Sequence, residues 1–232
     1  MTKKTRRRAQ RSQPVRTARR ADGRLALEVA NVTQSVTLPA DESAPIPGYW
    51  PRMLPECCPE RALLLGLGGG TLAALLARRC PSVRIVGIEH SAEVLAVERR
   101  EFGLDALSGL EMVDADAFTW VEEHAASEPA SYDLICLDLY DGGRLAPGTL
   151  ARPFLRQVAA LLRPDGVVSV NLMSTKRLPE QLHRIEHVFT IQRQIRLWGN
   201  VVLHLSLPAP APAPMEPAEP TPPPARSSPA VH

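Results

Sequence analysis

A glycine-rich loop between an apolar segment and a helical pattern constrains this 232-residue chain more than any other feature. Four glycines fall within five residues, after an apolar run at 62–67 and before a helical pattern at 71–79. Glycine tolerates positive φ and allows a ligand to approach the backbone closely. The pattern therefore predicts a nucleotide-binding loop rather than a plain tight turn. Its candidate cofactor contacts are Gly66, Gly68, Gly69, Gly70 and Thr71.

Strand and helix patterns alternate from residue 61 to residue 206. Apolar runs predict strands, and the segments between them have helical periodicity. The expected strands are 62–67, 83–88, 110–113, 133–137, 167–172, 189–198 and 201–207. The expected helices are 71–79, 92–102, 117–126, 150–162 and 178–187, with Gly166 as a left-handed cap after the fourth. This order predicts a doubly wound α/β fold: a mostly parallel, seven-stranded, Rossmann-like sheet with one antiparallel strand from the terminal hairpin.

Composition divides the rest of the chain. Residues 1–22 read as a disordered basic arm, since the first 20 carry two lysines, seven arginines and no acid. Such an arm can bind nucleic acid, although a solvated tail is the simpler interpretation. Residues 23–60 read as a small N-terminal β segment with a hairpin at 24–38. The domain spans 61–206, and the Pro/Ala-rich stretch 207–232 is expected to be disordered.

The sequence also bears on location and metals. It contains no apolar stretch of membrane-spanning length and no apolar leader at its start. The four cysteines form no C-x-x-C pair, which makes a structural zinc site improbable. His183 and His187 lie four apart without the glutamate of a zinc protease motif. We expect no metal, no membrane insertion, reduced thiols and a cytoplasmic protein.

Acidic residues follow successive predicted strands, at the edge where such sheets bind ligands. Glu89 closes the second strand and is positioned to accept hydrogen bonds from ribose hydroxyls. Asp116, with Ala117, follows the third strand and can accept a hydrogen bond from an adenine amine. Helix capping is the alternative role for Asp116. Asp138 and Asp141 follow the fourth strand and could orient an amine or accept its proton.

The loop departs from the dinucleotide fingerprint G-x-G-x-x-G, because Thr71 occupies the place of the third glycine. The motifs instead resemble class I S-adenosylmethionine-dependent methyltransferases, and more narrowly their spermidine synthase-like branch. The motifs that carry the resemblance are Leu-Gly-Leu-Gly-Gly-Gly-Thr, Val-Gly-Ile-Glu, Asp-Ala-Asp-Ala and Tyr-Asp-Leu-Ile-Cys-Leu-Asp-Leu-Tyr-Asp, followed by Leu-Leu-Arg-Pro-Asp-Gly-Val. It covers about residues 25–206.

The resemblance implies roles for individual residues. The loop glycines, Glu89 and Asp116 would hold the nucleotide, and Gln34 would touch it. Asp138 would match the catalytic acid of the aminopropyltransferases, with Asp141 as its partner. Tyr49 would line the amine pocket, and Tyr140 is a further candidate substrate contact. No metal ligand is implied.

Position 71 separates the functional alternatives. Aminopropyltransferases typically have an acid in the loop, which pairs with the ammonium of decarboxylated S-adenosylmethionine. Thr71 would not repel the carboxylate of ordinary S-adenosylmethionine, which favours methyl transfer to a small or peptidic nucleophile. Aminopropyl transfer to putrescine is the alternative, and a non-catalytic nucleotide-binding protein is a third. A homodimer is a further expectation.

Overall fold

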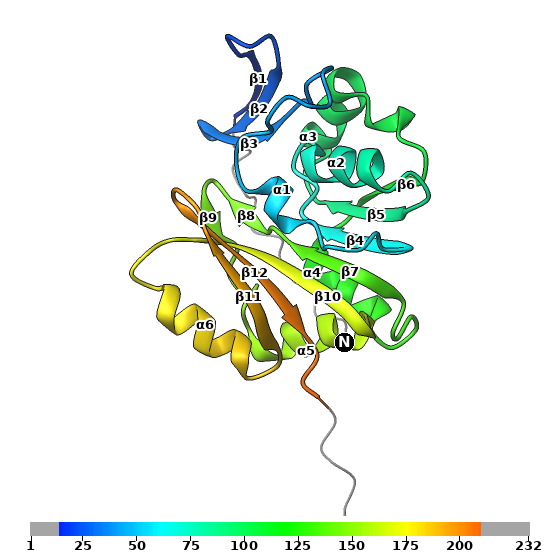
Figure 1. Cartoon of the computed structure of the whole chain (residues 1–232), viewed down its shortest axis with the longest axis vertical. Helices are drawn as coiled ribbons and strands as arrows, with labels where there is room; N and C mark the ends of the chain where they lie inside the picture. Colours follow the sequence, from blue (N-terminus) through cyan, green and yellow to red (C-terminus); the bar gives the residue numbers. More distant parts are fainter. Residues whose placement is uncertain (1–13, 210–232) are drawn as a thin grey trace, which may run out of the picture.

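The fold is a seven-stranded sheet with helices on both faces, and a smaller sheet of N-terminal strands lies beside it (Figure 1). The computed structural model describes residues 14–209. The large sheet has the order β11-β12-β10-β7-β4-β5-β6. Its strands are β4 (Arg61–Leu65), β5 (Arg84–Glu89), β6 (Leu110–Asp114), β7 (Tyr132–Leu137), β10 (Leu162–Met173), β11 (Thr190–Arg196) and β12 (Asn200–Ser206). A short hairpin follows β7 and consists of β8 (Tyr140–Asp141) and β9 (Arg144–Leu145).

The predicted mostly parallel topology is confirmed. Strands β6, β5, β4, β7 and β10 pair in parallel, whereas β12 is antiparallel to both β10 and β11. The terminal hairpin therefore inserts one reversed strand, as its turn at Gly199-Asn200 indicated. Because the parallel strands point the same way, their carboxyl ends form one common edge.

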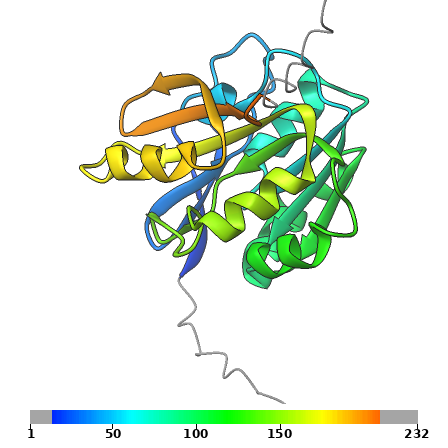
Figure 2. The ribbon, with the colours of Figure 1, turned by 90° about the horizontal axis from the view of Figure 1, so that it is seen from below.

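Six α-helices cover the faces of the sheet in the described part of the chain. They are α1 (Trp50–Met53), α2 (Thr71–Arg79), α3 (Ala92–Val97), α4 (Ala117–His124), α5 (Arg152–Leu161) and α6 (Leu178–Glu186). Helices α4, α5 and α6 lie across one face (Figure 2), where they share a core with Leu63 and Leu65. Helices α1 and α2 pack on the other face against Ala62 and Leu64. This alternation along β4 explains why the strand reads as continuously apolar.

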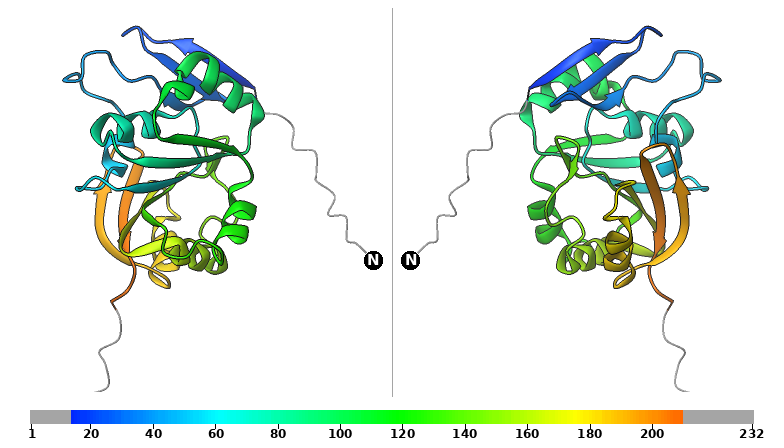
Figure 3. Two further views of the ribbon diagram at one scale, coloured as in Figure 1. Left: turned by 90° about the vertical axis from the view of Figure 1, so that its right-hand side faces the viewer. Right: turned by 90° about the vertical axis from the view of Figure 1, so that its left-hand side faces the viewer.

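The smaller sheet includes part of the predicted disordered arm. It consists of β1 (Val15–Arg19), β2 (Leu25–Val29) and β3 (Val32–Val36) in that order. The hairpin at 24–38 is confirmed, but disorder throughout 1–22 is wrong, because β1 pairs with β2 over five residue pairs. Leu27 of this sheet packs against Val94 and Val97. Figure 3 shows the smaller sheet beside the main domain. Residues 1–13 and the expected tail beyond residue 209 lie outside the described residues.

Two further local predictions are wrong, for identifiable reasons. Gly166 is not a left-handed cap: helix α5 ends at Leu161, and Gly166 lies within β10 at a bulge. A Cβ there would be 3.0 Å from the Arg163 carbonyl oxygen, so this glycine serves a close approach of the backbone. Cys58 and Cys80 form a disulfide rather than reduced thiols, with their Cα atoms 5.6 Å apart. The return of α2 beside the segment before β4 brings them together.

The remaining cysteines of the described chain are unpaired: Cys57 is exposed and Cys136 is buried, as its apolar run predicted. No helix among residues 14–209 is long and apolar enough to cross a membrane.

Thr71 joins the smaller sheet to the glycine loop. Its hydroxyl donates to the Val36 carbonyl oxygen at 2.6 Å and accepts from the Val36 amide at 2.7 Å. The Thr71 amide donates to Ser35 Oγ at 2.9 Å, and the two hydroxyls also contact each other. Ser35 and Thr71 are both buried. The threonine is therefore a structural link between β3 and the start of α2.

Replacing Thr71 with valine should destabilise the fold by about 1–3 kcal/mol, because two buried backbone groups of Val36 lose their partner. The change is measured as the free energy of unfolding in urea. Thr33→Val is the matched control, since Thr33 is exposed on the same strand and should shift stability by no more than about 0.5 kcal/mol. Equal losses in the two variants would contradict the assigned role.

Candidate functional site

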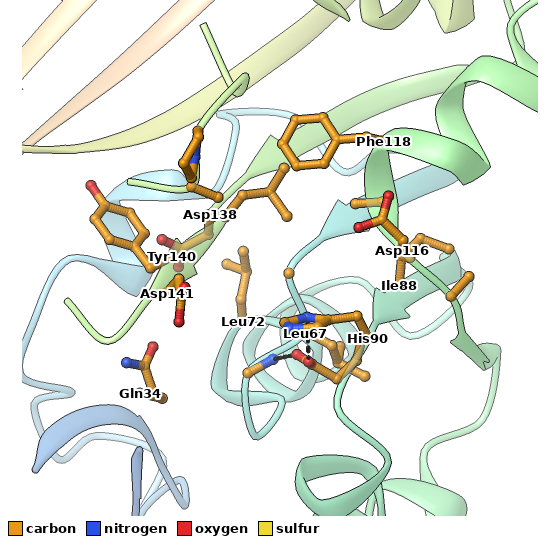
Figure 4. A pocket seen from close by; sticks show the side chains of 18 of the residues that line it. Gln34, Leu67, Leu72, Ile88, His90, Asp116, Phe118, Asp138, Tyr140 and Asp141 are labelled. Carbon is orange, nitrogen blue, oxygen red and sulfur yellow. Dashed lines mark hydrogen bonds and ion pairs between the residues drawn. The ribbon is translucent and has the colours of Figure 1, made fainter. Parts of the chain in front are cut away.

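A cavity of about 230 Å³ opens at the carboxyl edge of the sheet. Its walls come from β3, the glycine loop, the end of β5, the start of α4 and the segment after β7. Figure 4 shows Asp138, Tyr140 and Asp141 on one side of this cavity and Asp116 and His90 across it. The location agrees with the rule that open α/β sheets bind ligands beyond the carboxyl ends of their strands.

Most of the predicted site residues meet in this cavity. Those that line it are Gln34, Gly66, Gly68, Glu89, Asp116, Ala117, Asp138, Tyr140 and Asp141. Tyr49 does not line it but contacts Asp138. The other loop residues, Gly69, Gly70 and Thr71, do not line it either. The hydroxyl of Thr71 is hydrogen-bonded to Val36 of β3. We therefore correct the expectation that Thr71 contacts the cofactor.

Every backbone N–H group of the glycine loop already has an acceptor within the protein. The pairs are Gly66 and Leu67 with the Ile88 carbonyl oxygen, Gly68 with Glu89, Gly69 with Glu98, Gly70 with the Leu67 carbonyl oxygen, and Thr71 with Ser35. A phosphate-binding loop instead aims its amides at the ligand. This loop therefore provides a surface without side chains rather than a set of donors, which disfavours a dinucleotide.

Gly68 is the point of closest access to that surface. A Cβ built there would have only the Gln34 carbonyl oxygen within 4 Å, at 3.9 Å. At Gly66 the Cβ would lie 2.4 Å from the Asp138 carbonyl oxygen, so this glycine permits close packing of two strand ends. The two glycines thus have different roles: Gly66 brings β4 and β7 together, and Gly68 faces the cavity.

Glu89 ends β5 as a buried carboxylate in the cavity wall. Its Oε2 accepts from the Gly68 amide at 3.1 Å, and its Oε1 accepts from the Ser91 amide at 3.0 Å. His90 Nδ1 lies 3.3 Å from Oε1, and this hydrogen bond raises the pKa of the imidazole. The carboxylate is therefore fixed in place, and its remaining lone pairs can accept hydrogen bonds from ligand hydroxyls.

Asp116 has the capping role that was the alternative interpretation. Its Oδ1 accepts from the Thr119 amide at 3.0 Å at the start of α4. It also lines the cavity, beside Ala117 and Phe118. One carboxylate oxygen caps the helix, so a contact with an adenine amine stays a prediction that this geometry permits.

Asp138 is held by side chains from two distant parts of the chain. Its Oδ2 accepts from the Tyr49 hydroxyl at 2.6 Å, and its Oδ1 accepts from Asn171 Nδ2 at 2.9 Å. Asn200 Nδ2 in turn donates to Asn171 Oδ1 at 2.9 Å. The hydroxyl of Tyr140 donates to the Asn171 carbonyl oxygen at 3.1 Å. These hydrogen bonds hold the carboxylate between Tyr49, in the loop before α1, and the β11–β12 turn.

Burial raises the pKa of the Asp138 carboxyl to about 6, although its two hydrogen bonds act in the opposite direction. Burial also raises the pKa of the Tyr49 hydroxyl well above its usual value, and that of Tyr140. Both tyrosines therefore stay protonated near neutral pH. Asp138 alone of the three can exchange a proton in the physiological range, as a general base must.

The charged side chains of the cavity are mostly acidic. Four carboxylates and one histidine line it, and no lysine or arginine of the described chain does: the charged lining residues are Glu89, His90, Asp116, Asp138 and Asp141. A site of this kind attracts cations such as a sulfonium or an ammonium group. No group of three or more potential ligands among residues 14–209 is arranged to hold a metal ion.

The sequence of residues 60–205 matches a family of methyltransferase domains. This chain belongs to that family. A polyamine aminopropyltransferase from Vibrio vulnificus is 30% identical over 120 residues, which cover 52% of this chain and 40% of that protein. The chain spans between 40% and 56% of the length of the first two polyamine aminopropyltransferases that it matches.

Two solved structures have folds similar to that of this chain. The human Methyltransferase-like protein 13, in complex with SAH, has a TM-score of 0.60 and 26% identity, and the match covers 65% of this chain and 73% of that one. A probable spermidine synthase from Corynebacterium glutamicum has a TM-score of 0.66 and 20% identity over 83% of this chain and 76% of its own. At that identity the second likeness concerns the fold alone.

Several residues of this cavity were not foreseen. The apolar ones are Trp50, Leu67, Leu72, Ile88, Ala115, Phe118, Leu139, Ala146 and Pro147. Apolar residues next to a motif give no signal of their own in one sequence. Asn171 did offer a signal, because it is a lone amide within the apolar run 167–172. His90, directly after Glu89, is a second polar residue that the motifs alone did not single out.

Replacing Asp138 with asparagine should remove a pH-dependent loss of stability that amounts to about 2 to 3 kcal/mol above pH 6. One hydrogen bond is lost at every pH, because the amide nitrogen cannot accept from Tyr49 or Asn171. The pKa is near 3.8 in the unfolded chain and about 6 in the fold, so the folded state binds more protons between these values. Stability therefore falls as pH rises through that window, and asparagine removes this loss.

Thermal unfolding at about pH 5 and pH 8 measures the effect. The exposed Asp165→Asn variant removes the same charge from β10 and should show no such pH-dependent gain. A change of stability in Asp138→Asn that is the same at both pH values would contradict a raised pKa at this position.

Proposed function

We propose that the protein transfers a methyl group from S-adenosylmethionine to an amine. One observation carries the proposal: an acidic cavity without lysine or arginine lies against a glycine loop that offers no free amide to a phosphate. A sulfonium nucleoside such as S-adenosylmethionine has a positive charge and no phosphate, so it fits both properties. Membership of the methyltransferase domain family supports the same nucleotide.

The cavity residues fit an adenosyl group element by element. Glu89 would accept hydrogen bonds from the ribose hydroxyls, and Asp116 would accept one from the adenine amine. Phe118 and Ile88 would contact the faces of the adenine ring. Gly68 would leave room for the methionine portion, next to Gln34. All six residues line the same cavity. When bound, the nucleotide supplies an electrophilic carbon next to a cationic sulfur.

The chain's own residues would then orient the acceptor and move its proton. A neutral amine is the nucleophile, so a protonated amine must lose a proton before attack. Asp138, whose carboxyl has a pKa of about 6, is partly ionised near neutral pH and can accept that proton at Oδ1 or Oδ2. Tyr49 and Asn171 would keep these oxygens aimed at the amine. The amine would attack the methyl carbon in line with its bond to sulfur, and sulfur would leave as a neutral thioether. Such a displacement depends mainly on alignment.

Thr71 no longer separates methyl from aminopropyl transfer, because its hydroxyl is hydrogen-bonded to Val36 of β3. Aminopropyl transfer from decarboxylated S-adenosylmethionine is the second candidate. It is favoured by the lack of a cationic side chain to pair with the carboxylate of the ordinary nucleotide. The likeness to methyltransferase domains over most of the described chain favours methyl transfer. A non-catalytic nucleotide-binding protein is the third candidate.

Other properties stay predictions. They are a small or peptidic acceptor, a homodimer, a cytoplasmic location, and nucleic-acid contact by the basic arm, most of which lies outside the described residues.

Isothermal titration tests the nucleotide directly. S-adenosylmethionine, its decarboxylated form and nicotinamide adenine dinucleotide are titrated into the whole chain. Binding of the first with clearly lower affinity for the second supports methyl transfer. Preference for the decarboxylated form supports aminopropyl transfer, and binding of the dinucleotide alone contradicts both. Putrescine and a lysine-containing peptide then serve as acceptor probes in a methyl-transfer assay.

Gly68→Asn should weaken binding of S-adenosylmethionine by about tenfold or more, because the new side chain would occupy the cavity next to Gln34. Asparagine tolerates the positive φ of 50° at this position better than most residues do. Gly103→Asn is the matched control: φ is 67°, and nothing lies within 4 Å of the added Cβ. Unchanged affinity in Gly68→Asn would contradict the placement of the nucleotide.

A further inference from the structure

Glu98 is a buried acid that the proposed reaction does not use. Its side chain is fully buried, and its Oε1 accepts from the Gly69 amide at 2.7 Å. Its Oε2 is also buried and has no hydrogen-bond partner. Burying a carboxylate without full hydrogen bonding costs free energy, so the presence of Glu98 beside the glycine loop calls for an explanation.

Glu98 lies at the start of an unusual turn. Helix α3 ends at Val97 and continues as a π-helical turn, Glu98–Phe102, that closes at Gly103 with φ of 67°. Turns of this kind are rare and often occur at functional sites. Because the turn follows directly from α3, whose N-cap is Ser91, Glu98 and Glu89 are attached to the same short segment of chain.

Two acids from that segment hold two consecutive amides of the loop. Glu89 accepts from Gly68, and Glu98 accepts from Gly69. Glu89 lies in the cavity wall, whereas Glu98 does not line the cavity and supports the loop from behind. Two charged groups act on Glu98: Glu89 at the end of β5 disfavours its ionisation, and Arg99 in its own turn favours it.

We propose that Glu98 is a positioning residue of the cofactor loop that gives up its proton when a positively charged nucleotide binds. Its hydrogen bond to Gly69 fixes the loop, and its charge favours a cation on the opposite side. The inference rests on the proposed function, because it requires a sulfonium nucleotide at Gly68.

The sign of the effect follows from the protonation of Glu98. Burial raises the pKa of its carboxyl to about 7, so the group is largely protonated below neutral pH. A cation in the cavity stabilises the carboxylate and lowers this pKa. By linkage, S-adenosylmethionine binds more tightly as pH rises through 7. S-adenosylhomocysteine has no sulfonium charge and should show a weaker dependence.

Titration calorimetry of S-adenosylmethionine at about pH 6 and pH 8 tests the inference. The pKa of Asp138 is about 6 and that of His90 is raised by Glu89. Both groups are present in every variant, so the comparison between variants isolates Glu98. Glu98→Gln keeps an acceptor for Gly69 but has no proton to lose. We expect affinity in the unaltered chain to rise about fivefold more between the two pH values than in Glu98→Gln. Glu101→Gln changes the same charge within the same turn and should behave like the unaltered chain.

A Glu98→Gln variant that keeps the full pH dependence overturns the inference, as does a Glu101→Gln variant that loses it. If Glu98→Gln does not fold, the unaltered chain with carbon-13-labelled glutamate replaces it in a nuclear magnetic resonance titration. The pKa of the buried glutamate should then fall on addition of S-adenosylmethionine, and an unchanged value overturns the inference. Absence of nucleotide binding at both pH values instead contradicts the proposed function.

Discussion

The site depends on how the protein satisfies the backbone N–H groups of its own glycine loop. All six amides from residue 66 to residue 71 are occupied by internal acceptors. Two of those acceptors are the side chains of buried acids, Glu89 and Glu98, which hold the adjacent amides of Gly68 and Gly69. The loop is therefore rigid before any ligand arrives. A rigid surface without side chains can contact a flat, uncharged adenosyl group closely, whereas it cannot solvate a phosphate.

The same locking makes distant parts of the chain necessary to the site. The smaller sheet holds the start of α2 through Ser35 and Thr71, so the N-terminal strands support the loop. On the opposite side of the cavity, the β11–β12 turn reaches Asp138 through Asn200 and Asn171. The methyltransferase domain thus fixes its two functional walls from elements near its two ends. The carboxyl edge of the parallel sheet provides the place where these walls meet.

Features that depend on neighbouring residues could be predicted from the sequence, whereas contacts between residues far apart in the chain could not. Strand and helix patterns, the loop and the acids after each strand are local signals, and the sheet brought nine predicted residues to one cavity. The role of Thr71 could not be foreseen, since its partners lie 35 and 36 residues away in β3. The Cys58–Cys80 pair depends on the path of β4 and α2. The arginine-rich arm gave a misleading signal, because strand pairing outweighed the composition of β1.

A crystal structure of the chain with S-adenosylhomocysteine tests the central claim most directly, because it locates the nucleotide against the fixed loop. We expect the ribose hydroxyls within hydrogen-bond distance of Glu89 and the sulfur atom between Gly68 and Asp138. We also expect the loop amides to keep their internal acceptors. A nucleotide bound elsewhere, or one whose binding releases these amides from Glu89 and Glu98, would contradict the account.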